Sequence, residues 1–326
     1  MKRQSRLARH STGSVLIDEA IPAGAESPLH PRLTALIAVA RALTPVVTAV
    51  VFPGDATAVD AALAAAGLGI IDPVFYGSAA ARDALRAAHT SVPFRWIDTG
   101  ESPRAAAAEA VADAAAGRVA VLMKGSLHTD ELLGAVLARD SGLRGASRLT
   151  HTFVFDLPRY HKLLAVTDAV VNIAPDLQTK AQSITHAVEL MLQLGVASPK
   201  VAVIAAVETV HPSINATVDA QTLAEWGRAG RFGSATVDGP LGFDTAISAQ
   251  AAATKGIASS VAGNPDILLV PELNAGNVLY KSFIYIGGGE CAGIVQGALV
   301  PIVLTSRADS LFSRIASCAL ARIALR

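Results

Sequence analysis

The sequence predicts an α/β protein with two three-layer domains, each a mostly parallel sheet between helices. Alanine-rich stretches of helical length alternate with short β-branched runs, which is typical of parallel sheets covered by helices. Hydrophobic residues make up 52% of the 326 residues and charged residues only 17%, so a large core is expected. At roughly 150 residues per domain, this length indicates two domains.

The first half of the chain alternates regularly between the two patterns. Pro31 opens a helix, and Pro45 stops it before a β-branched run. Asp55 is placed as the cap of the next helix, which Gly67 ends. The predicted helices are 31–43, 56–66, 79–88 and 103–115, and the predicted strands are 46–52, 70–76, 94–97 and 119–123.

The second half begins near Leu149 and is less regular. We expect a strand pair within 163–175 that turns at Asp168, and a glycine- and proline-rich loop at 237–244. The other predicted strands are 150–158, 201–206, 266–270, 283–286 and 300–304, and the other predicted helices are 180–194, 245–260, one starting at 274–281, a possible one at 293–299, and a terminal one from about 309.

The charge balance and the cysteine content limit the partners and the cellular setting that we expect for this protein. The 27 basic residues balance 27 acidic ones, which argues against a nucleic-acid partner. Cys291 and Cys318 are too few for a disulfide framework and favour a reduced, cytoplasmic setting. The apolar windows 33–52 and 283–305 contain charges and prolines, so we expect no membrane partner. None of the eight histidines has HxxxH or HExxH spacing, so we expect no metal site.

Two strand ends carry side chains suited to binding an anion. Residues 124–131 follow the strand 119–123, where helix N–H groups, Lys124 and the hydroxyls of Ser126 and Thr129 suit a phosphate. The simpler interpretation is a strand-to-helix turn with Ser or Thr as the cap.

The second strand end follows the strand 300–304. There Ser306 can donate a hydrogen bond, Arg307 can bind phosphate with two N–H groups, and Asp309 can act as a base. The alternative is an ordinary cap of the terminal helix, with the arginine in solvent.

A glycine cluster offers a competing interpretation. Residues 287–292 satisfy G-x-G-x-x-A after a predicted strand, and Asp309 lies 20 residues beyond Gly289. This is the fingerprint of dinucleotide binding and would indicate an NAD-dependent dehydrogenase. Pro301, directly after the possible helix 293–299, argues against it, and a structural glycine turn is the simpler hypothesis.

The loop 237–244 allows two interpretations. Its glycines, Gly239 among them, would let the backbone approach a ligand, although turns account for most such loops. Asp244 is placed equally well to cap a helix or to act as an acid or base. The sequence has neither G-x-S-x-G nor GxxxxGK[ST], which argues against a serine hydrolase and a P-loop kinase.

Several of these segments form a larger ordered pattern. They are 123–125 (MKG) with 128–129 (HT), 171–177 (VNIAPDL), 206–210 (AVETV), 239–244 (GPLGFD), 274–281 (NAGNVLYK) and 287–307. From Pro31 to the last residue, the chain resembles the phosphate acetyltransferase and phosphate butyryltransferase family. The runs VETVHPSINATVDA and NIAPDLQTK resemble the butyryl type. The chain is also similar to the C-terminal phosphate acyltransferase part of enoyl-CoA hydratase/phosphate acetyltransferase proteins, without a hydratase segment.

The resemblance implies a fold, a reaction and partners. The fold would be like isocitrate and isopropylmalate dehydrogenases, with residues 1–148 and 302–326 in one domain, 149–301 in the other, and the active-site cleft between them. The reaction would be reversible transfer of an acetyl or butyryl group between coenzyme A and inorganic phosphate, by direct attack in a ternary complex. Acyl-CoA, phosphate and acyl phosphate would be the substrates, without a further cofactor, and the protein would be a homodimer.

The resemblance also implies roles for individual residues. Ser306 would donate to the developing oxyanion and Arg307 would bind phosphate. Acetyl-type members carry a catalytic aspartate where this sequence has Ser313, so Asp309 is the candidate base. They also carry an arginine after the HT turn, where residues 132–136 are apolar here, with Arg139, Arg144 and Arg148 as possible substitutes. The predicted substrate-binding residues are Lys124, Ser126, His128, Thr129, Gly239, Asp244, Asn277, Tyr280 and Lys281.

Two other functions stay open at this point. The missing acid at Ser313 also fits a non-catalytic sensor of acyl-CoA or acyl phosphate. The glycine cluster keeps the NAD-dependent dehydrogenase as a third hypothesis. Phosphate-dependent thiol release would separate the first two functions, and nicotinamide binding would test the third.

Overall fold

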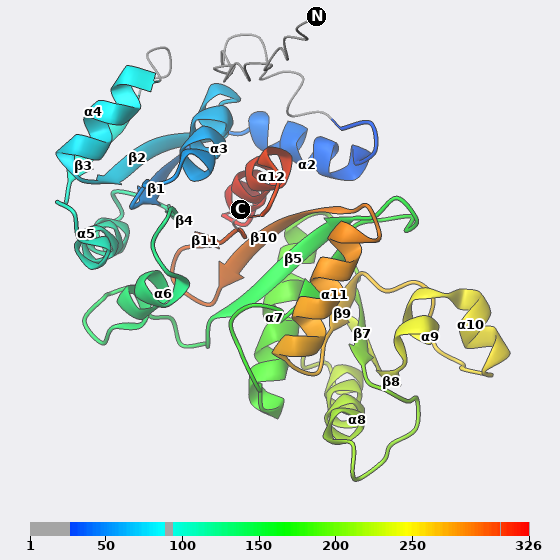
Figure 1. The fold of residues 1–326 in the computed structure, drawn as a ribbon. Coiled ribbons are helices and arrows are strands. Elements are labelled where there is room, and N and C mark those ends of the chain that lie inside the picture. Colours follow the sequence, from blue (N-terminus) through cyan, green and yellow to red (C-terminus); the bar gives the residue numbers. More distant parts are fainter. Residues whose placement is uncertain (1–26, 89–93, 307, 326) are drawn as a thin grey trace, which may run out of the picture.

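The fold is built on one large sheet. A computed structural model describes residues 27–88, 94–306 and 308–325, and element labels follow Figure 1. The strands are β1 (Val46–Val51), β2 (Ile71–Gly77), β3 (Arg95–Asp98), β4 (Val121–Lys124), β5 (Thr150–Asp156), β6 (Leu164–Thr167), β7 (Lys200–Ile204), β8 (Thr236–Leu241), β9 (Ile267–Leu269), β10 (Glu290–Gln296) and β11 (Ile302–Val303). They lie in the order β3-β2-β1-β4-β11-β10-β5-β6-β9-β7-β8.

Helices cover both faces of this sheet (Figure 1). They are α2 (Pro31–Arg41), α3 (Ala56–Gly67), α4 (Ala79–Ala88), α5 (Pro103–Ala115), α6 (Thr129–Leu137), α7 (Leu177–Gln193), α8 (Asn215–Arg228), α9 (Phe243–Ile247), α10 (Ala249–Thr254), α11 (Leu273–Tyr285) and α12 (Leu311–Ile323). In the described ranges, no helix is both long and apolar enough to cross a membrane.

The predicted alternation of the first half is confirmed. Each predicted helix and strand up to β4 is present, with bounds shifted by one or two residues. Local caps account for the agreement, because the Asp55 carboxylate accepts from the Ala58 N–H at 2.8 Å and the Ser102 hydroxyl accepts from the Ala105 N–H. These signals lie within four residues of the element that they start.

The second half departs from the sequence predictions at several points. The expected strand pair within 163–175 is wrong, because only β6 forms. After β6, the Asp168 carboxylate accepts hydrogen bonds from the backbone N–H groups of Val170 and Val171, both at 2.9 Å, and holds them in a turn. The predicted loop 237–244 is strand β8 followed by α9, the predicted helix 245–260 is divided into α9 and α10, and α8 was not predicted.

The segment 283–299 is where the predicted secondary structure is reversed. The expected strand 283–286 is wrong, because α11 continues to Tyr285, and Gly287 then donates its N–H to the Ser282 carbonyl to close the last turn. The possible helix 293–299 is also wrong, since its first residues belong to β10 and pair with β5. The secondary structure of this segment is determined by pairing with distant strands, which the local sequence pattern does not indicate.

Antiparallel strands join the two parallel parts of the sheet. We expected two sheets, but β10 pairs antiparallel with both β11 and β5, and β5 pairs antiparallel with β6. The strands from β3 to β11 are parallel to one another, as are β6, β9, β7 and β8. The result is a mixed, mostly parallel sheet that runs unbroken through the molecule.

The hydrophobic core is continuous on one face of the sheet and divided on the other. On the first face, α2, α3, α12, α7 and α8 contribute to a single cluster that includes Leu63, Ile184 and Leu320. On the second face, one cluster lies under α5 and α6, and a separate one lies under α11. Val170 packs against both of these clusters, which places it at the boundary between them.

Candidate active site

A pocket of about 310 Å³ lies between the two separate cores. Its walls come from the end of β4 and the start of α6, from the end of β11, from the middle of α11, and from β5. Because β4 and β11 are adjacent and parallel, their carboxyl ends bring Lys124 and Ser306 together. The lining residues are Lys124, Leu127, His128, Thr129, Phe153, Val170, Asn277, Tyr280, Lys281, Leu304, Thr305 and Ser306.

The pocket therefore gathers most of the predicted site residues from distant parts of the chain. Lys124, His128, Thr129, Asn277, Tyr280, Lys281 and Ser306 all line it. Lys124 brings positive charge from the end of β4 and Lys281 from α11, and α6 begins at Thr129 beside the same pocket. Cationic side chains next to a helix N-terminus suit an anionic ligand.

A glycine allows the loop at the end of β4 to form. A Cβ on Gly125 would lie 2.4 Å from the carbonyl oxygens of both Val51 and Phe52, so a larger residue cannot follow Lys124 without moving the end of β1. The Ser126 hydroxyl fixes the same contact by donating to the Phe52 carbonyl at 3.0 Å and accepting from the Gly54 N–H at 3.0 Å. Ser126 therefore braces two loops and does not line the pocket.

Asp309 lies behind Ser306 and accepts hydrogen bonds from two donors among the described residues. The Ser306 N–H donates to Asp309 Oδ2 at 2.6 Å, and the Tyr280 hydroxyl donates to Asp309 Oδ1 at 2.5 Å. Burial raises the pKa of Asp309 above its ordinary value, although both hydrogen bonds and the nearby Arg314 act to lower it. The carboxylate is therefore more basic than an exposed aspartate.

Tyr280 connects the two parts of the site. Its ring stacks flat on Phe153 of β5, with centroids 4.4 Å apart and an interplanar angle of 4°. Burial, the hydrogen bond to Asp309 and the negative charge of Asp309 raise the pKa of Tyr280, while a hydrogen bond with the Ser306 side chain lowers it. The phenol is thus neutral, and its hydrogen bond to Asp309 links α11 to the loop after β11.

Arg314 is a residue of this site that the sequence analysis missed. It is only 4% exposed, and its guanidinium donates to the Ser306 carbonyl at 2.9 Å and to the Thr305 hydroxyl at 3.3 Å. Its Nε also donates to the Asp309 carbonyl at 3.3 Å, so one side chain fixes the whole turn. The available signal was the position of Arg314 in the mostly apolar run 311–321, where a charge stays buried only with partners. Arg139, Arg144 and Arg148, the expected substitutes for a second arginine, do not line the pocket.

Several other predicted residues are not brought to the pocket. Gly239 lies in β8, the outermost strand, where a Cβ would lie 2.7 Å from the Val203 carbonyl, so this glycine serves strand packing. Asp244, in the first turn of α9, pairs with Lys255 at 2.9 Å. Arg307, predicted to bind phosphate, lies outside the described residues.

Ser313, at the position of the aspartate expected from the resemblance, is part of the core. Its hydroxyl accepts from the Cys291 N–H at 3.1 Å and donates to the Glu290 carboxylate. Ser310 also donates to Glu290, at 2.7 Å, so this carboxylate ties the start of α12 to β10. Neither Ser313 nor Glu290 lines the pocket.

The dinucleotide interpretation of the glycine cluster does not fit the structure. Residues 287–289 follow a helix and precede a strand, whereas the fingerprint requires a strand followed by a helix. Among the described residues, no group of three or more His, Cys, Asp or Glu side chains is placed to hold a metal ion.

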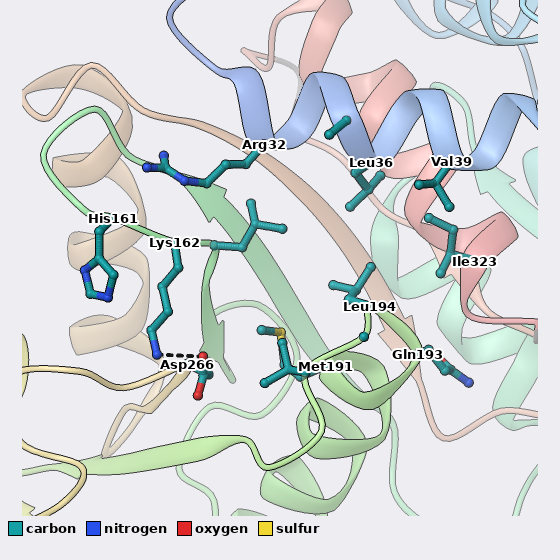
Figure 2. A pocket seen from close by; sticks show the side chains of 14 residues that line it. Arg32, Leu36, Val39, His161, Lys162, Met191, Gln193, Leu194, Asp266 and Ile323 are labelled. Atoms are coloured by element: carbon teal, nitrogen blue, oxygen red, sulfur yellow. Dashed lines mark ion pairs between the residues drawn. The ribbon is translucent and has the colours of Figure 1, made fainter.

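A larger pocket lies between α2, the end of α7 and the end of α12 (Figure 2). Its volume is about 560 Å³, and apolar side chains such as Leu36 and Met191 form most of its wall. Its cations already have partners, since Lys162 pairs with Asp266 at 2.7 Å and Arg32 pairs with Asp156 at 2.6 Å. This pocket is larger than the one at Ser306, but its charges are neutralised and it holds none of the predicted site residues.

His151 supports the floor of the smaller pocket. It is fully buried beside Phe153, with ring centroids 4.2 Å apart, and its Nε2 lies 3.4 Å from the Leu304 carbonyl oxygen. Its Nδ1 has no hydrogen-bond partner among the described residues. Burial lowers the pKa of His151 to about 4, against the opposing effects of Asp168 and the Leu304 carbonyl.

We expect His151 to make the protein less stable in acid. An unfolded histidine titrates near 6.5, so between pH 6.5 and about 4 the unfolded chain binds a proton that the folded chain does not. The contribution of neutral His151 to the free energy of unfolding is full above pH 6.5, and about 2 kcal/mol of it is lost by pH 5. Replacing His151 with glutamine should flatten the change in unfolding free energy between pH 7 and pH 5 by that amount, measured by urea unfolding. The control is His161→Gln, which changes a histidine of the exposed His161–Asn264 pair, and equal slopes for both variants would contradict the prediction.

Fold and pocket together define a class: an α/β protein with a pocket that places two lysines and a helix N-terminus beside a hydroxyl donor and a half-buried carboxylate. A family model described as "Phosphate acetyl/butaryl transferase" matches residues 98–322, which is more than half of the chain. The chain belongs to this phosphate acetyl/butyryl transferase family.

Individual relatives agree with the family. The chain is 45% identical over 289 residues to a phosphate acetyltransferase of Rhizobium meliloti, which covers 88% of this chain and 92% of the relative. It is 50% identical over 201 residues to a probable phosphate butyryltransferase of Bacillus subtilis, covering 62% of this chain and 67% of that one. Among solved structures, a branched-chain phosphotransacylase from Enterococcus faecalis superimposes with a TM-score of 0.72 at 28% identity, covering 85% and 99% of the two chains.

Proposed function

We propose that this protein is a phosphate acyltransferase that catalyses acyl-CoA + phosphate ⇌ acyl phosphate + CoA with an acetyl or butyryl group. The observation that carries the proposal is the convergence of Lys124, Ser306 and the start of α6 on one pocket, with the Asp309 carboxylate behind it. Family membership and the names of the relatives support the same reaction. Coenzyme A is a substrate here, and no further cofactor is part of the proposal.

The phosphate group is proposed to bind at the cationic side of the pocket. Lys124 and Lys281 supply positive charge, and the N–H groups at the start of α6, beside His128 and Thr129, supply hydrogen bonds. Arg307, adjacent to Ser306 in the chain, is proposed to add a bidentate contact.

The acyl group is proposed to react beside Ser306. Its hydroxyl donates to the oxyanion that forms when the thiol attacks the acyl carbonyl, a contribution of about 10²–10³-fold in rate. Asp309 removes the thiol proton, and its raised pKa favours that role. The thiolate attacks directly, without a covalent enzyme intermediate, while both substrates are bound.

Alignment of the two substrates is proposed to come from two domains. We assign residues 1–148 and 302–326 to one domain and 149–301 to the other, as in isocitrate and isopropylmalate dehydrogenases. The division of the core on the pocket face supports this assignment. Holding two reactants in line contributes up to about 7–11 kcal/mol to lowering a barrier.

The test is thiol release from acetyl-, propionyl- and butyryl-CoA, with and without inorganic phosphate. Release that requires phosphate supports the acyltransferase and ranks the acyl chains in the same experiment. Binding of acyl-CoA without thiol release from any of the three acyl-CoA substrates would contradict the proposal and favour a non-catalytic sensor.

We also propose a homodimer that uses the outer side of α11. Val278, Tyr285 and the C-cap residue Ile286 are 65%, 68% and 87% exposed, an unusual concentration of exposed apolar side chains on one helix and its end. Asn277 and Lys281 of the same helix line the pocket. A cytoplasmic setting is part of the proposal, supported by two buried cysteines that form no disulfide.

A charge on the outer side of α11 is expected to weaken the dimer. Tyr285→Asp should raise the dissociation constant of the dimer by at least about tenfold, because a carboxylate would lose its water in an apolar interface. Analytical ultracentrifugation over a dilution series measures this shift. Leu29→Asp, at a residue 72% exposed and outside α11, is the matched control. A Tyr285→Asp protein that dissociates like the wild type would place the interface elsewhere.

A further inference from the structure

The candidate base has no direct contact with the pocket. Asp309 is not among the lining residues, and each of its carboxylate oxygens already accepts a hydrogen bond. One of these donors is the Ser306 backbone N–H, which cannot pass on a proton and remain an amide. The other is the Tyr280 hydroxyl, and Tyr280 does line the pocket. Among the described residues, the hydrogen-bonded route from pocket to carboxylate therefore runs through the tyrosine.

We propose that Tyr280 is a catalytic residue, whose hydroxyl relays the proton between the thiol of coenzyme A and the Asp309 carboxylate. The proposal rests on the proposed acyltransferase function and adds a group that touches the reacting sulfur. Asp309 then acts through Tyr280 and does not meet the thiol itself.

In the direction of thioester formation, every bond change is accounted for. The thiol S–H bond breaks as the sulfur electron pair forms the S–C bond to the acyl carbonyl carbon. The thiol proton moves to Tyr280 Oη, and the tyrosine proton moves at the same time to Asp309 Oδ1. When the tetrahedral intermediate collapses, the C–O bond to phosphate breaks and the phosphate leaves with that electron pair. The proton returns from Asp309 through Tyr280 to the departing phosphate, so that tyrosine and carboxylate are restored.

The environment of Tyr280 favours a hydroxyl that passes on a proton over a phenolate that acts as a base. Burial and the negative charge of Asp309 disfavour a phenolate, so the hydroxyl gives up its proton only as it receives one. Burial also makes the Asp309 carboxylate a stronger base than an exposed aspartate. The flat stacking on Phe153 fixes the ring, which keeps the 2.5 Å hydrogen bond in place during the transfer.

The first experiment is Tyr280→Phe, which removes the hydroxyl and keeps the stacked ring. We expect kcat for thioester formation from acyl phosphate and CoA to fall by about 10²-fold, with little change in KM. A matched control exists in the same chain, because Tyr76 is a buried tyrosine that donates to a buried aspartate, Asp113, at 2.6 Å, and neither lines the pocket. Tyr76→Phe removes the same kind of hydrogen bond and is expected to keep kcat.

The pH profile separates a relay from a tyrosine that merely positions Asp309. With the relay intact, kcat/KM reaches a plateau once Asp309 is deprotonated. Without the hydroxyl, the reaction needs thiolate formed in solution, so kcat/KM of Tyr280→Phe should rise tenfold per pH unit up to the thiol pKa, near 8.5 for a cysteine thiol. A purely positioning tyrosine would lower the plateau and leave its shape unchanged, which would overturn the proposal.

Combining Tyr280→Phe with Asp309→Asn provides the second test. The effects of substituting two residues of one relay are not additive, so the double variant should be no slower than the slower single variant. Losses that multiply would show two independent roles and overturn the relay. Unchanged kcat in Tyr280→Phe would also overturn it, while phosphate-dependent thiol release by the wild type would keep the proposed function. A wild type without such release would refute the function itself, and the relay with it.

Discussion

Replacing Asp309 with asparagine is expected to lower kcat by about 10²–10⁴-fold, the range of a lost general base. Asparagine keeps the size of the side chain and an oxygen for the Tyr280 hydroxyl, but it cannot accept the thiol proton at neutral pH. Wild-type activity should be full above the pKa of Asp309 and fall as the pH drops through it. Because burial raises that pKa, the fall should occur at a higher pH than for an exposed aspartate near 3.9.

The measurement is the rate of thioester formation between pH 4 and pH 9 for both proteins. The control is Asp113→Asn, which alters a second aspartate that accepts from a tyrosine, away from the pocket. Circular dichroism melting checks that each variant is folded. An Asp309→Asn protein with the wild-type pH profile would remove Asp309 from the mechanism.

Replacing Ser306 with alanine is expected to lower kcat by about 10²–10³-fold with a modest change in KM. The hydroxyl is needed most when negative charge develops on the acyl oxygen, so its loss affects the transition state more than substrate binding. The Ser306 N–H remains to hold Asp309, so the base keeps its position in this variant. Steady-state kinetics with acyl phosphate and CoA give both constants.

Ser310 provides the matched control for Ser306. Its hydroxyl lies four residues further along the same turn and caps α12 by accepting from the Ser313 N–H at 3.0 Å. Ser310→Ala should therefore cost about 0.5–2 kcal/mol of stability and leave kcat near the wild-type value. Equal kcat for Ser306→Ala and the wild type would show that another group stabilises the oxyanion.

The sequence predicted those parts of the fold that local signals control. In the first half, caps such as Asp55 and stops such as Pro45 lie within a few residues of the elements that they bound. In the segment 283–299 a strand was predicted where the helix α11 ends, and a helix where the strand β10 lies. β10 forms because it pairs with β11 and with β5, and β5 lies more than a hundred residues earlier in the chain. No window of local sequence contains that partner.

The candidate site was predictable where it lies at strand ends. Lys124 and Ser306 come together because β4 and β11 are parallel neighbours, a consequence of the fold class alone. Gly239 and Asp244 were proposed from the glycine-rich pattern of 237–244 and from the resemblance. Neither says whether a motif serves the pocket or, as here, the strand edge and the pair with Lys255. Arg314 was missed because its role depends on the loop that folds back over it.

The position of β11 and α12 has a consequence for synthesis of the chain. Residues 302–323 complete the edge of β4 and pack against α2 and α3, elements that are translated well before them. At 5–20 residues per second, the ribosome needs about 10–35 s to add the roughly 180 residues between β4 and β11. During that interval the nascent β1–β4 unit exposes an unpaired strand edge and an uncovered apolar helix surface. The β1–β4 unit therefore completes its folding only after β11 and α12 have been made, and a chaperone that shields strand edges would raise the yield of this protein.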